Sequence, residues 1–183
     1  MSKSRIVVLS GPSGSGKSSV IQGIQEKENC SLVVSTTTRS PRPGEIDGID
    51  YHFTSRESFQ DLMETGEFIE YMEFNGNLYG VKKSDLHVHV EGDKTIILDL
   101  SCSGARKVKE IYEDATLIFL LPPSYQVARQ RLLSRGMTHE EIVLREQDDD
   151  SPLSEARFYD LLVVNRTDRL EETTSTILHH LNS

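Results

Sequence analysis

Tryptophan, cysteine and long apolar runs are scarce or absent in this sequence of 183 residues, which contains no tryptophan and two cysteines. Cys30 and Cys102 lie far apart in the chain, which matches neither a disulfide framework nor the spacing of a zinc site. Reduced thiols are typical of a cytosolic protein. The apolar runs are shorter than the roughly 18 residues of a membrane helix, and the first is too short for a signal peptide. We therefore expect a cytoplasmic protein with no membrane partner.

Positive charge is also in short supply. The sequence has 20 Lys and Arg residues against 29 Asp and Glu residues, which gives a net charge of −9. Such a chain repels nucleic acids and anionic lipids at long range, which disfavours a nucleic-acid partner or a role at a membrane surface. Any anion that the protein binds must therefore be held by local structure. The length favours one globular unit whose core needs no disulfide or metal.

Apolar runs of strand length alternate with helical patterns along most of the chain. The runs are nearly continuous in apolar character, as in strands that are buried on both faces of a parallel sheet. They cover residues 6–9, 32–34, 95–100, 115–121 and 160–164. Helical patterns follow residue 17 and occupy residues 104–113, 124–135, 139–157 and 169–181. This order predicts an α/β fold in which helices flank a parallel sheet.

Two segments interrupt this alternation. Residues 39–92 are rich in Gly, Pro, Tyr and Phe and contain alternating patterns, which predicts an inserted, small, β-rich subdomain. A later segment is long and charged and contains Ser151-Pro152, which indicates a helical lid. We therefore expect a single domain over residues 1–183, with the insertion at 39–92, the lid at about 126–158, and a core made of 1–38, 93–125 and 159–183.

The most specific motif is a phosphate-binding loop. Residues 11–18, GPSGSGKS, satisfy G-x-x-x-x-G-K-[ST] between a predicted strand and a predicted helix, which is the context of a P-loop. Its backbone N–H groups and the helix N-terminus would hold phosphate, Lys17 would contact the β and γ phosphates, and the Ser18 hydroxyl would be a Mg²⁺ ligand. The motif predicts a P-loop NTPase-type sheet that binds ATP with Mg²⁺. The expected ATP-binding residues here are Gly11, Pro12, Ser13, Gly14, Ser15, Gly16, Lys17, Ser18 and Ser19.

A second candidate anion site follows the second predicted strand. Arg39 and Arg42 lie in a loop that Pro41 and Pro43 stiffen. Two guanidinium groups on a rigid turn suit a second phosphate group, although a solvated basic turn is the alternative. Tyrosines at 51 and 79 could add O–H donors, or they could simply pack against the small sheet.

Glu70 is a candidate for recognition of a base. Strict alternation over residues 67–74 places Phe68, Glu70, Met72 and Phe74 on one face of a strand. A carboxylate among apolar side chains is costly unless donors reach it. The N1–H and N2–H₂ edge of guanine would supply two such donors. The alternatives are that this face is exposed to solvent, or that Glu70 pairs with an internal arginine.

The chain resembles guanylate kinases, which are ATP:GMP phosphotransferases. The resemblance rests on the blocks 11–18, 35–53, 66–80, 103–109, 131–136 and 163–165. It implies that the insertion binds GMP, with its phosphate held by Arg39, Arg42, Tyr51 and Tyr79 and its base by Ser35 and Glu70. It also implies that Arg131, Arg135 and Arg145 contact phosphate, the first two on ATP. The implied catalytic residues are Lys17, Arg39, Arg135 and Arg145.

Two positions depart from the family pattern. Val81 stands where the family usually has Ser or Thr, and Ser101 stands where it usually has Asp. Asp99 lies on the same side of its strand as Ser101, where it could restore negative charge or merely end a buried strand. The alternatives to GMP phosphorylation are a related kinase with another or broader monophosphate acceptor, and a noncatalytic protein-binding module, which the intact Lys17 and Ser18 disfavour. We expect ATP and GMP as partners of a monomer or small homo-oligomer.

Two acidic or histidine-containing clusters are weak metal signals. His87 and His89 could share a strand face but have no third ligand, and on a helix they would diverge. The acidic run Asp148-Asp149-Asp150 beside Glu146 is read as a solvated lid surface. We therefore expect no metal ligand other than Ser18.

Overall fold

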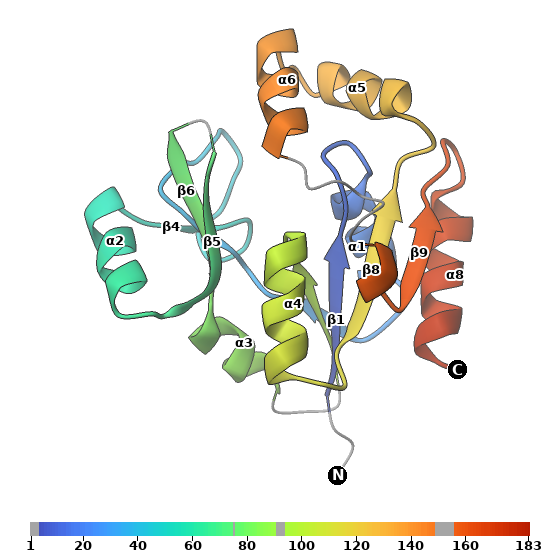
Figure 1. Cartoon of the computed structure of the whole chain (residues 1–183), viewed down its shortest axis with the longest axis horizontal. Coiled ribbons are helices and arrows are strands. Elements are labelled where there is room, and N and C mark those ends of the chain that lie inside the picture. The colour runs from blue at the N-terminus through green and yellow to red at the C-terminus, as the bar shows by residue number, and fades with distance from the viewer. Residues whose placement is uncertain (1–3, 75, 91–93, 149–155) are drawn as a thin grey trace.

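A parallel sheet of five strands forms the centre of the computed structural model, which describes residues 4–74, 76–90, 94–148 and 156–183. The strand order is β2-β7-β1-β8-β9, and every neighbouring pair is parallel. The strands are β1 Arg5–Ser10, β2 Cys30–Leu32, β7 Thr95–Asp99, β8 Thr116–Leu121 and β9 Leu161–Val164. The predicted α/β fold with helices flanking a parallel sheet is confirmed (Figure 1).

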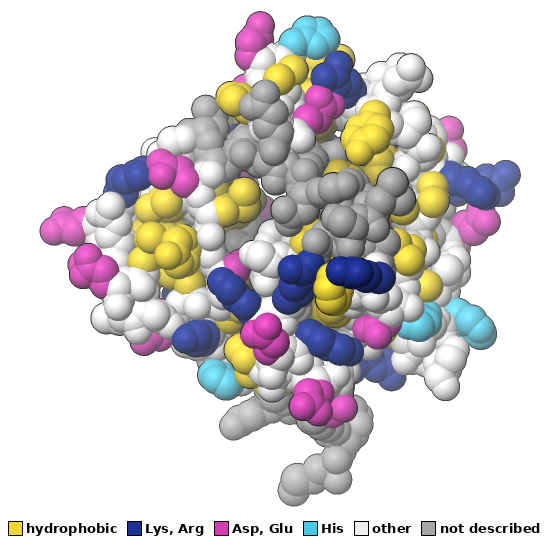
Figure 2. Space-filling view, viewed as in Figure 1, with side chains coloured by type: hydrophobic (Ala, Val, Ile, Leu, Met, Phe, Trp, Pro, Cys, Tyr) yellow, Lys and Arg dark blue, Asp and Glu magenta, His cyan; other side chains and the backbone are white. Residues whose placement is uncertain are grey.

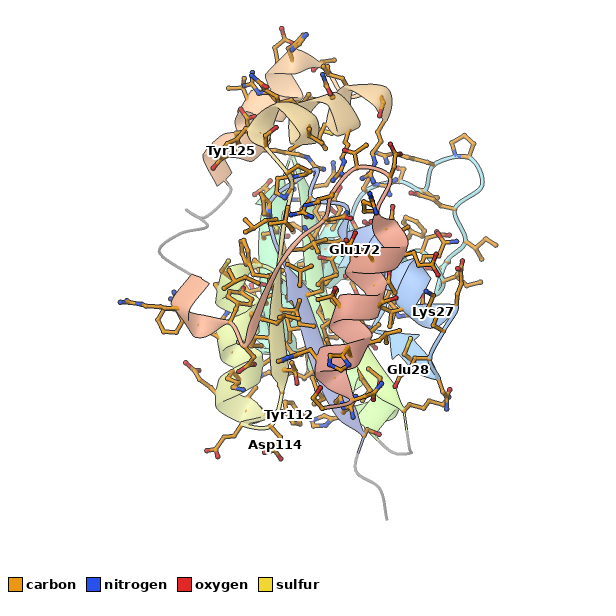
Figure 3. The ribbon with its side chains drawn as sticks, turned by 90° about the vertical axis from the view of Figure 1, so that its right-hand side faces the viewer. Lys27, Glu28, Tyr112, Asp114, Tyr125 and Glu172 are labelled. Carbon is orange, nitrogen blue, oxygen red and sulfur yellow. The ribbon has the colours of Figure 1, made fainter. Side chains whose placement is uncertain are left out.

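Both faces of this sheet are buried, which explains the continuous apolar runs in the sequence. Alternate residues of β1 enter two different clusters: Val8 packs with α4 (Cys102–Ile111), whereas Val7 and Leu9 pack with α1 (Lys17–Gln25) and α8 (Leu170–Leu181). Figure 3 shows α8 lying along the sheet. Acidic and basic side chains are interspersed over the face seen in Figure 2.

A second, smaller sheet lies within the predicted insertion and on its border. Its strand order is β4-β3-β6-β5, with strands β3 Thr36–Thr37, β4 His52–Phe53, β5 Phe68–Phe74 and β6 Asn77–Lys82. Two helices, α2 (Arg56–Glu64) and α3 (Lys83–Val90), accompany it. The sequence analysis did not predict these helices. Figure 1 shows this sheet and α2 to one side of the parallel sheet.

The alternation expected along β5 is wrong at its start. The pairing of β5 with β6 shifts register between Phe68 and Glu70, which is a β-bulge. Phe68 therefore packs with Phe59 and Leu78 under α2, while Glu70 and Met72 line a pocket on the other side. Phe68 does not share a face with Glu70, because the extra residue in the bulge reverses the side to which the following side chains point.

The segment predicted as a lid forms two short helices. They are α5 (Tyr125–Ser134) and α6 (His139–Asp148), which lie across the carboxyl edge of the sheet (Figure 1). Of the helix expected over 139–157, α6 accounts for the part up to Asp148, residues 149–155 lie outside the described residues, and the expectation is wrong at its end, where Ala156–Phe158 forms a 3₁₀ turn. Ser151-Pro152 and the aspartates at 149 and 150 lie outside the described residues.

Small differences in the remaining elements do not change the architecture. The strand expected at 32–34 is instead Cys30–Leu32, although the N–H of Val33 still donates to the carbonyl of Ile97. His87 lies on α3 near the hydroxyl of Tyr112, so the strand face proposed for a histidine pair is wrong. Within the described ranges, no cluster of three His, Cys, Asp or Glu side chains could hold a metal ion, and no helix is long and apolar enough to cross a membrane.

A stacked aromatic pair lies in the apolar cluster between the small sheet and α2, and it yields a stability prediction. Phe59 is fully buried, and its ring stacks on Phe68 with the centroids 4.3 Å apart. Phe59→Ala should lower the free energy of unfolding by about 3–5 kcal/mol, because it removes buried area and leaves a cavity. Chemical denaturation measures this loss. The exposed Ile49 is a control, and Ile49→Ala should change stability by less than about 0.5 kcal/mol. Equal effects of the two substitutions would contradict the prediction.

Candidate functional site

A pocket of about 330 Å³ lies between the carboxyl edge of the parallel sheet and the small sheet. Strands β1 and β7 end here, as parallel strands commonly do at ligand sites. The pocket brings together residues from both predicted nucleotide sites, for example Lys17 and Glu70. The predicted residues that line it are Gly11, Pro12, Ser13, Lys17, Ser35, Tyr51, Glu70, Tyr79 and Arg145. Arg39, Arg42, Arg131 and Arg135 are not among the residues that line it.

The predicted phosphate loop connects β1 to α1, and three of its glycines have positive φ angles. Gly16 has a φ of 95° and caps α1, a conformation that favours glycine. A Cβ on Gly14 would lie 2.6 Å from the carbonyl oxygen of Ala128, so the loop packs tightly on α5. The first turn of a helix has N–H groups without intrahelical partners. In α1 this turn contains Lys17, Ser18 and Ser19, of which Ser18 and Ser19 are exposed. The loop therefore offers the donors that an anion needs.

The ammonium group of Lys17 lies over the loop. Its Nζ donates to the carbonyl oxygen of Gly11 at 2.7 Å and lies 3.9 Å from Oδ1 of Asp99. Burial raises the pKa of Asp99, and the charge of Lys17 opposes this shift. The sequence left two readings of Asp99 open; the structure places its carboxylate in the pocket beside the lysine. This carboxylate and this ammonium partly neutralise each other in the absence of a ligand.

Two side chains support the loop from its far side. Arg131 of α5 donates to the carbonyl oxygens of Gly14 and Ser15 at 3.2 and 3.1 Å and to that of Asn165 at 3.0 Å. Buried Asn165 donates from Nδ2 to the carbonyl oxygen of Ser15 at 2.8 Å. Asn165 was not among the residues predicted from the sequence. The available signal was an asparagine directly after a buried apolar strand.

The arginines of the α5–α6 segment lie in different surroundings. Nη1 of Arg145 on α6 lies 3.4 Å from the hydroxyl oxygen of Ser13, which brings α6 to the phosphate loop. Arg135 is exposed at the end of α5. Arg131 faces the loop carbonyls, so its guanidinium contacts the backbone that would hold phosphate. Of these three arginines, the pocket includes Arg145.

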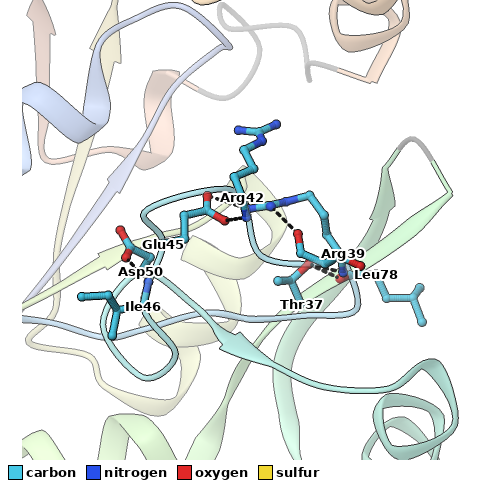
Figure 4. A network of polar contacts seen from close by, with 8 residues as sticks. Thr37, Arg39, Arg42, Glu45, Ile46, Asp50 and Leu78 are labelled. Carbon is cyan, nitrogen blue, oxygen red and sulfur yellow. Dashed lines mark hydrogen bonds and ion pairs between the residues drawn. The ribbon is translucent and has the colours of Figure 1, made fainter.

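The loop with Arg39 and Arg42 forms a network of polar contacts (Figure 4). Nη2 of Arg39 lies 2.8 Å from Oε1 of Glu45, and the N–H of Arg42 donates to Oε2 of the same carboxylate at 2.7 Å. The hydrogen bond from Arg39 is the main cause that lowers the pKa of Glu45. The guanidinium of Arg39 also lies 5.4 Å from the ring centroid of Tyr51. Glu45 therefore orients Arg39, and an anion bound there would compete with Glu45.

The far end of the pocket contains Glu70. Its Oε1 accepts a hydrogen bond from the N–H of Ser101 at 2.9 Å, and its Oε2 accepts one from the Ser101 hydroxyl. Burial raises the pKa of Glu70, and these two hydrogen bonds oppose the shift. Glu70 itself is half-buried, whereas Met72 on the same face is exposed. The alternative of an arginine partner is wrong among the described residues, because the donors to the carboxylate come from Ser101. Buried Val81 lines the same region, where the aromatic rings of Tyr51 and Tyr79 lie 6.2 Å apart.

Comparisons with known proteins agree on one family. A family model described as guanylate kinase matches residues 3–183. A guanylate kinase of Pseudomonas fluorescens is 40% identical over 162 residues, which are 87% of this chain and 79% of that protein. One of Synechococcus sp. is 40% identical over 90% of this chain and 91% of its own length. The crystal structure of a guanylate kinase from Anaplasma phagocytophilum is 33% identical, with a TM-score of 0.75, over 100% of this chain and 86% of that one.

The support of the phosphate loop by Asn165 yields a binding prediction. Asn165→Ala removes the hydrogen bond to Ser15, so the affinity for ATP should fall by up to about tenfold, the effect of one hydrogen bond. Equilibrium titration of the purified protein with ATP measures this. The hydroxyl of Thr173 lies 3.3 Å from Oδ1 of Asn165, so Thr173→Val leaves the contact with Ser15 intact and should have a smaller effect. A folded Asn165→Ala protein with unchanged affinity would show that this support is dispensable.

Proposed function

This chain belongs to the guanylate kinase family and transfers a phosphoryl group from ATP to GMP, and we propose that one pocket holds the two nucleotides end to end. The observation that carries this arrangement is that Lys17 of the phosphate loop and Glu70 of the small sheet line the same pocket. ATP would lie on the loop and GMP against the small sheet. Because GDP is a purine nucleotide, we propose that the protein acts in purine nucleotide metabolism, in the cytoplasm.

The donor site consists of the loop and the first turn of α1. Backbone N–H groups within residues 13–19 would hold the phosphates of ATP, and Lys17 would contact the β and γ phosphates. Nζ of Lys17 donates to the carbonyl oxygen of Gly11 in this structure, and an ammonium group has three N–H donors, which leaves donors for phosphate. Arg131 would act mainly by supporting the loop backbone, to which it donates, and Arg135, which is exposed at the end of α5, would contact phosphate.

We propose that Mg²⁺ enters with ATP and is held by the Ser18 hydroxyl. Mg²⁺ keeps several waters and usually takes one or two protein ligands together with substrate phosphates, rather than a cage made of protein. The residues fit this mode, because Ser18 is exposed in the first turn of α1 and the described residues offer no cage of carboxylates. Bound there, the ion would neutralise charge on the phosphates.

The acceptor site would be formed by the insertion, residues 39–92, together with Ser35. Arg39, Arg42, Tyr51 and Tyr79 would hold the phosphate of GMP, while Ser35 and Glu70 would hold its base. Arg39 is already oriented by Glu45 and by Tyr51. Glu70 offers two carboxylate oxygens to the adjacent N1–H and N2–H₂ groups of guanine. Adenine has a bare acceptor at N1, so the same carboxylate would face a lone pair.

The chemistry requires positioning and charge stabilisation rather than a nucleophile from the protein. A phosphate oxygen of GMP attacks the γ-phosphorus of ATP, the bond to the β,γ-bridging oxygen breaks, and ADP leaves. The attacking oxygen is already anionic near neutral pH, so no strong general base is needed. Lys17, Arg39, Arg135 and Arg145 would stabilise the charge that spreads over the transferred group. Closure of the segment at about 126–158 over the pocket would exclude water.

The role of Lys17 can be tested directly. Lys17→Ala should lower kcat by roughly 10²–10³-fold, because it removes positive charge from the transferred phosphate. A coupled assay of ADP formation with GMP as acceptor measures kcat. Lys27→Ala, at an exposed position just beyond α1, is the matched control and should leave kcat unchanged. The catalytic role of Lys17 would be ruled out if the Lys17→Ala protein folds and retains more than half of the kcat of the unaltered protein.

The role of Glu70 is tested by a panel of nucleoside monophosphates. Glu70→Gln should lower kcat/KM for GMP by about 10²-fold and bring it closer to kcat/KM for AMP. The substitution removes a charge-assisted hydrogen bond, and the amide N–H₂ that replaces one carboxylate oxygen faces an N–H donor of guanine. Glu73→Gln, at an exposed position on the same strand, should leave both values unchanged. Equal use of GMP and AMP by the unaltered protein would falsify the base-reading role and favour a broader acceptor.

A further inference from the structure

We propose that Ser101 is a positioning residue that orients Glu70 for the base of GMP, an inference that rests on the proposed role of Glu70. Ser101 contacts both oxygens of that carboxylate. Its N–H donates to Oε1 at 2.9 Å, and its hydroxyl donates to Oε2. Two donors from one residue fix both the position of the carboxylate and the plane in which it lies, whereas one donor would leave it free to rotate.

Ser101 can orient the carboxylate of Glu70 because its own side chain is held at the start of α4. It is the N-cap of α4, and its hydroxyl oxygen accepts a hydrogen bond from the N–H of Gly104 at 3.2 Å while donating to Glu70. The Ser101 hydroxyl also lies 3.2 Å from the hydroxyl oxygen of Ser103. With the Ser103 hydroxyl as the donor in that contact, the Ser101 proton goes to the carboxylate of Glu70. The N-terminus of α4 also brings partial positive charge to this point, which favours the ionised form of Glu70.

The fit between β5 and α4 is close. A Cβ on Gly104 would lie 2.2 Å from Oε2 of Glu70, so any side chain at this position would displace the carboxylate. Gly104 itself is buried in the first turn of α4. The absence of a side chain at 104 and the hydroxyl at 101 together form a seat that holds the carboxylate of Glu70.

The seat leaves the carboxylate able to bind a base. An ionised carboxylate has about four lone-pair positions, and Ser101 occupies one on each oxygen. One position on each oxygen remains for a ligand, which matches the two parallel N–H donors of guanine. Ser101 would not need to contact the base itself. It would act by holding Glu70 ionised and correctly turned.

The charges around Glu70 agree with this role. Burial raises its pKa, and the bonds from Ser101 are the largest effects that lower it, followed by the charge of Lys107 on α4; Asp99 of β7 raises it. The other titratable or charged side chains that line the pocket are Lys17, Tyr51, Tyr79, Cys102 and Arg145. Loss of the Ser101 hydroxyl should therefore raise the pKa of Glu70 further, so that less of the carboxylate is ionised at mildly acid pH.

The test compares Ser101→Ala with Ser101→Thr, which keeps the hydroxyl and the helix cap. The matched control is Ser55→Ala, which removes the serine that caps α2 without touching the pocket.

We expect kcat/KM for GMP in Ser101→Ala to fall about tenfold at about pH 8, the effect of a lost hydrogen bond to a charged group. The loss at about pH 5.5 should be at least roughly threefold larger, because protonated Glu70 cannot accept both donors. Comparison with the unaltered protein at each pH cancels the titration of the GMP phosphate, whose second pKa is near 6.

The outcomes separate the two proposals. The inference is supported if kcat/KM for GMP in Ser101→Ala falls more at the lower pH and comes closer to kcat/KM for AMP. Ser101→Thr and Ser55→Ala should have kcat/KM values close to those of the unaltered protein. A loss that is equal at both pH values, or that Ser55→Ala shares, would show only a general helix-cap effect and would overturn the inference. If Glu70→Gln narrows the GMP to AMP ratio and Ser101→Ala does not, Ser101 alone is misassigned. If Glu70→Gln leaves that ratio unchanged, the proposed role of Glu70 is wrong, and the inference about Ser101 that rests on it is wrong as well.

Discussion

Repulsion between two phosphorylated nucleotides is the constraint on which the rest of this structure depends. The chain has a net charge of −9, so its overall field opposes both substrates rather than attracting them. Attraction must come from groups within a few ångströms of each phosphate. In the proposed arrangement, the N-terminus of α1, Lys17 and Arg145 would supply it for ATP, and the loop with Arg39 would supply it for the phosphate of GMP. The two carboxylates in the pocket, Asp99 and Glu70, each lie beside an ammonium or a pair of donors.

A loop that binds phosphate through its backbone works best when it is rigid before the ligand arrives. Arg131 and Asn165 bind the outer carbonyls of the loop, and α5 packs directly against Gly14. These contacts connect the loop to α5 and to the end of β9. The N–H groups would therefore need little reordering if ATP binds as proposed, which would lower the entropy lost on binding. On the proposed acceptor side, Glu45 contacts Arg39 and Ser101 contacts Glu70, and these contacts would act in the same way.

The sequence contained a signal for helix α2 that the sequence analysis did not use, but none for the bulge in β5. Ser55, followed by Phe59, Leu62 and Met63 at helical spacing, is a helix signal that the abundance of Gly and aromatic residues obscured. The bulge in β5 had no such signal, because alternation assumes that every residue of one strand faces one residue of its partner. A single extra residue at that point moved Phe68 under α2 and left Glu70 in the pocket.

The sequence by itself determined the parallel sheet, the phosphate loop and the family, since these depend on short-range patterns: buried strands read as apolar runs, and the loop needs glycines, Lys17 and Ser18 at fixed spacing. It also indicated which arginines and carboxylates to examine. Only the tertiary structure decided their partners. Arg131 proved to bind the loop backbone, Glu70 proved to be seated on Ser101, 31 residues away in the chain, and Asn165 joined the site. Such partners are set by the packing of α4 and α5 against distant segments, and a hydrogen bond between distant residues leaves no periodic trace in the sequence.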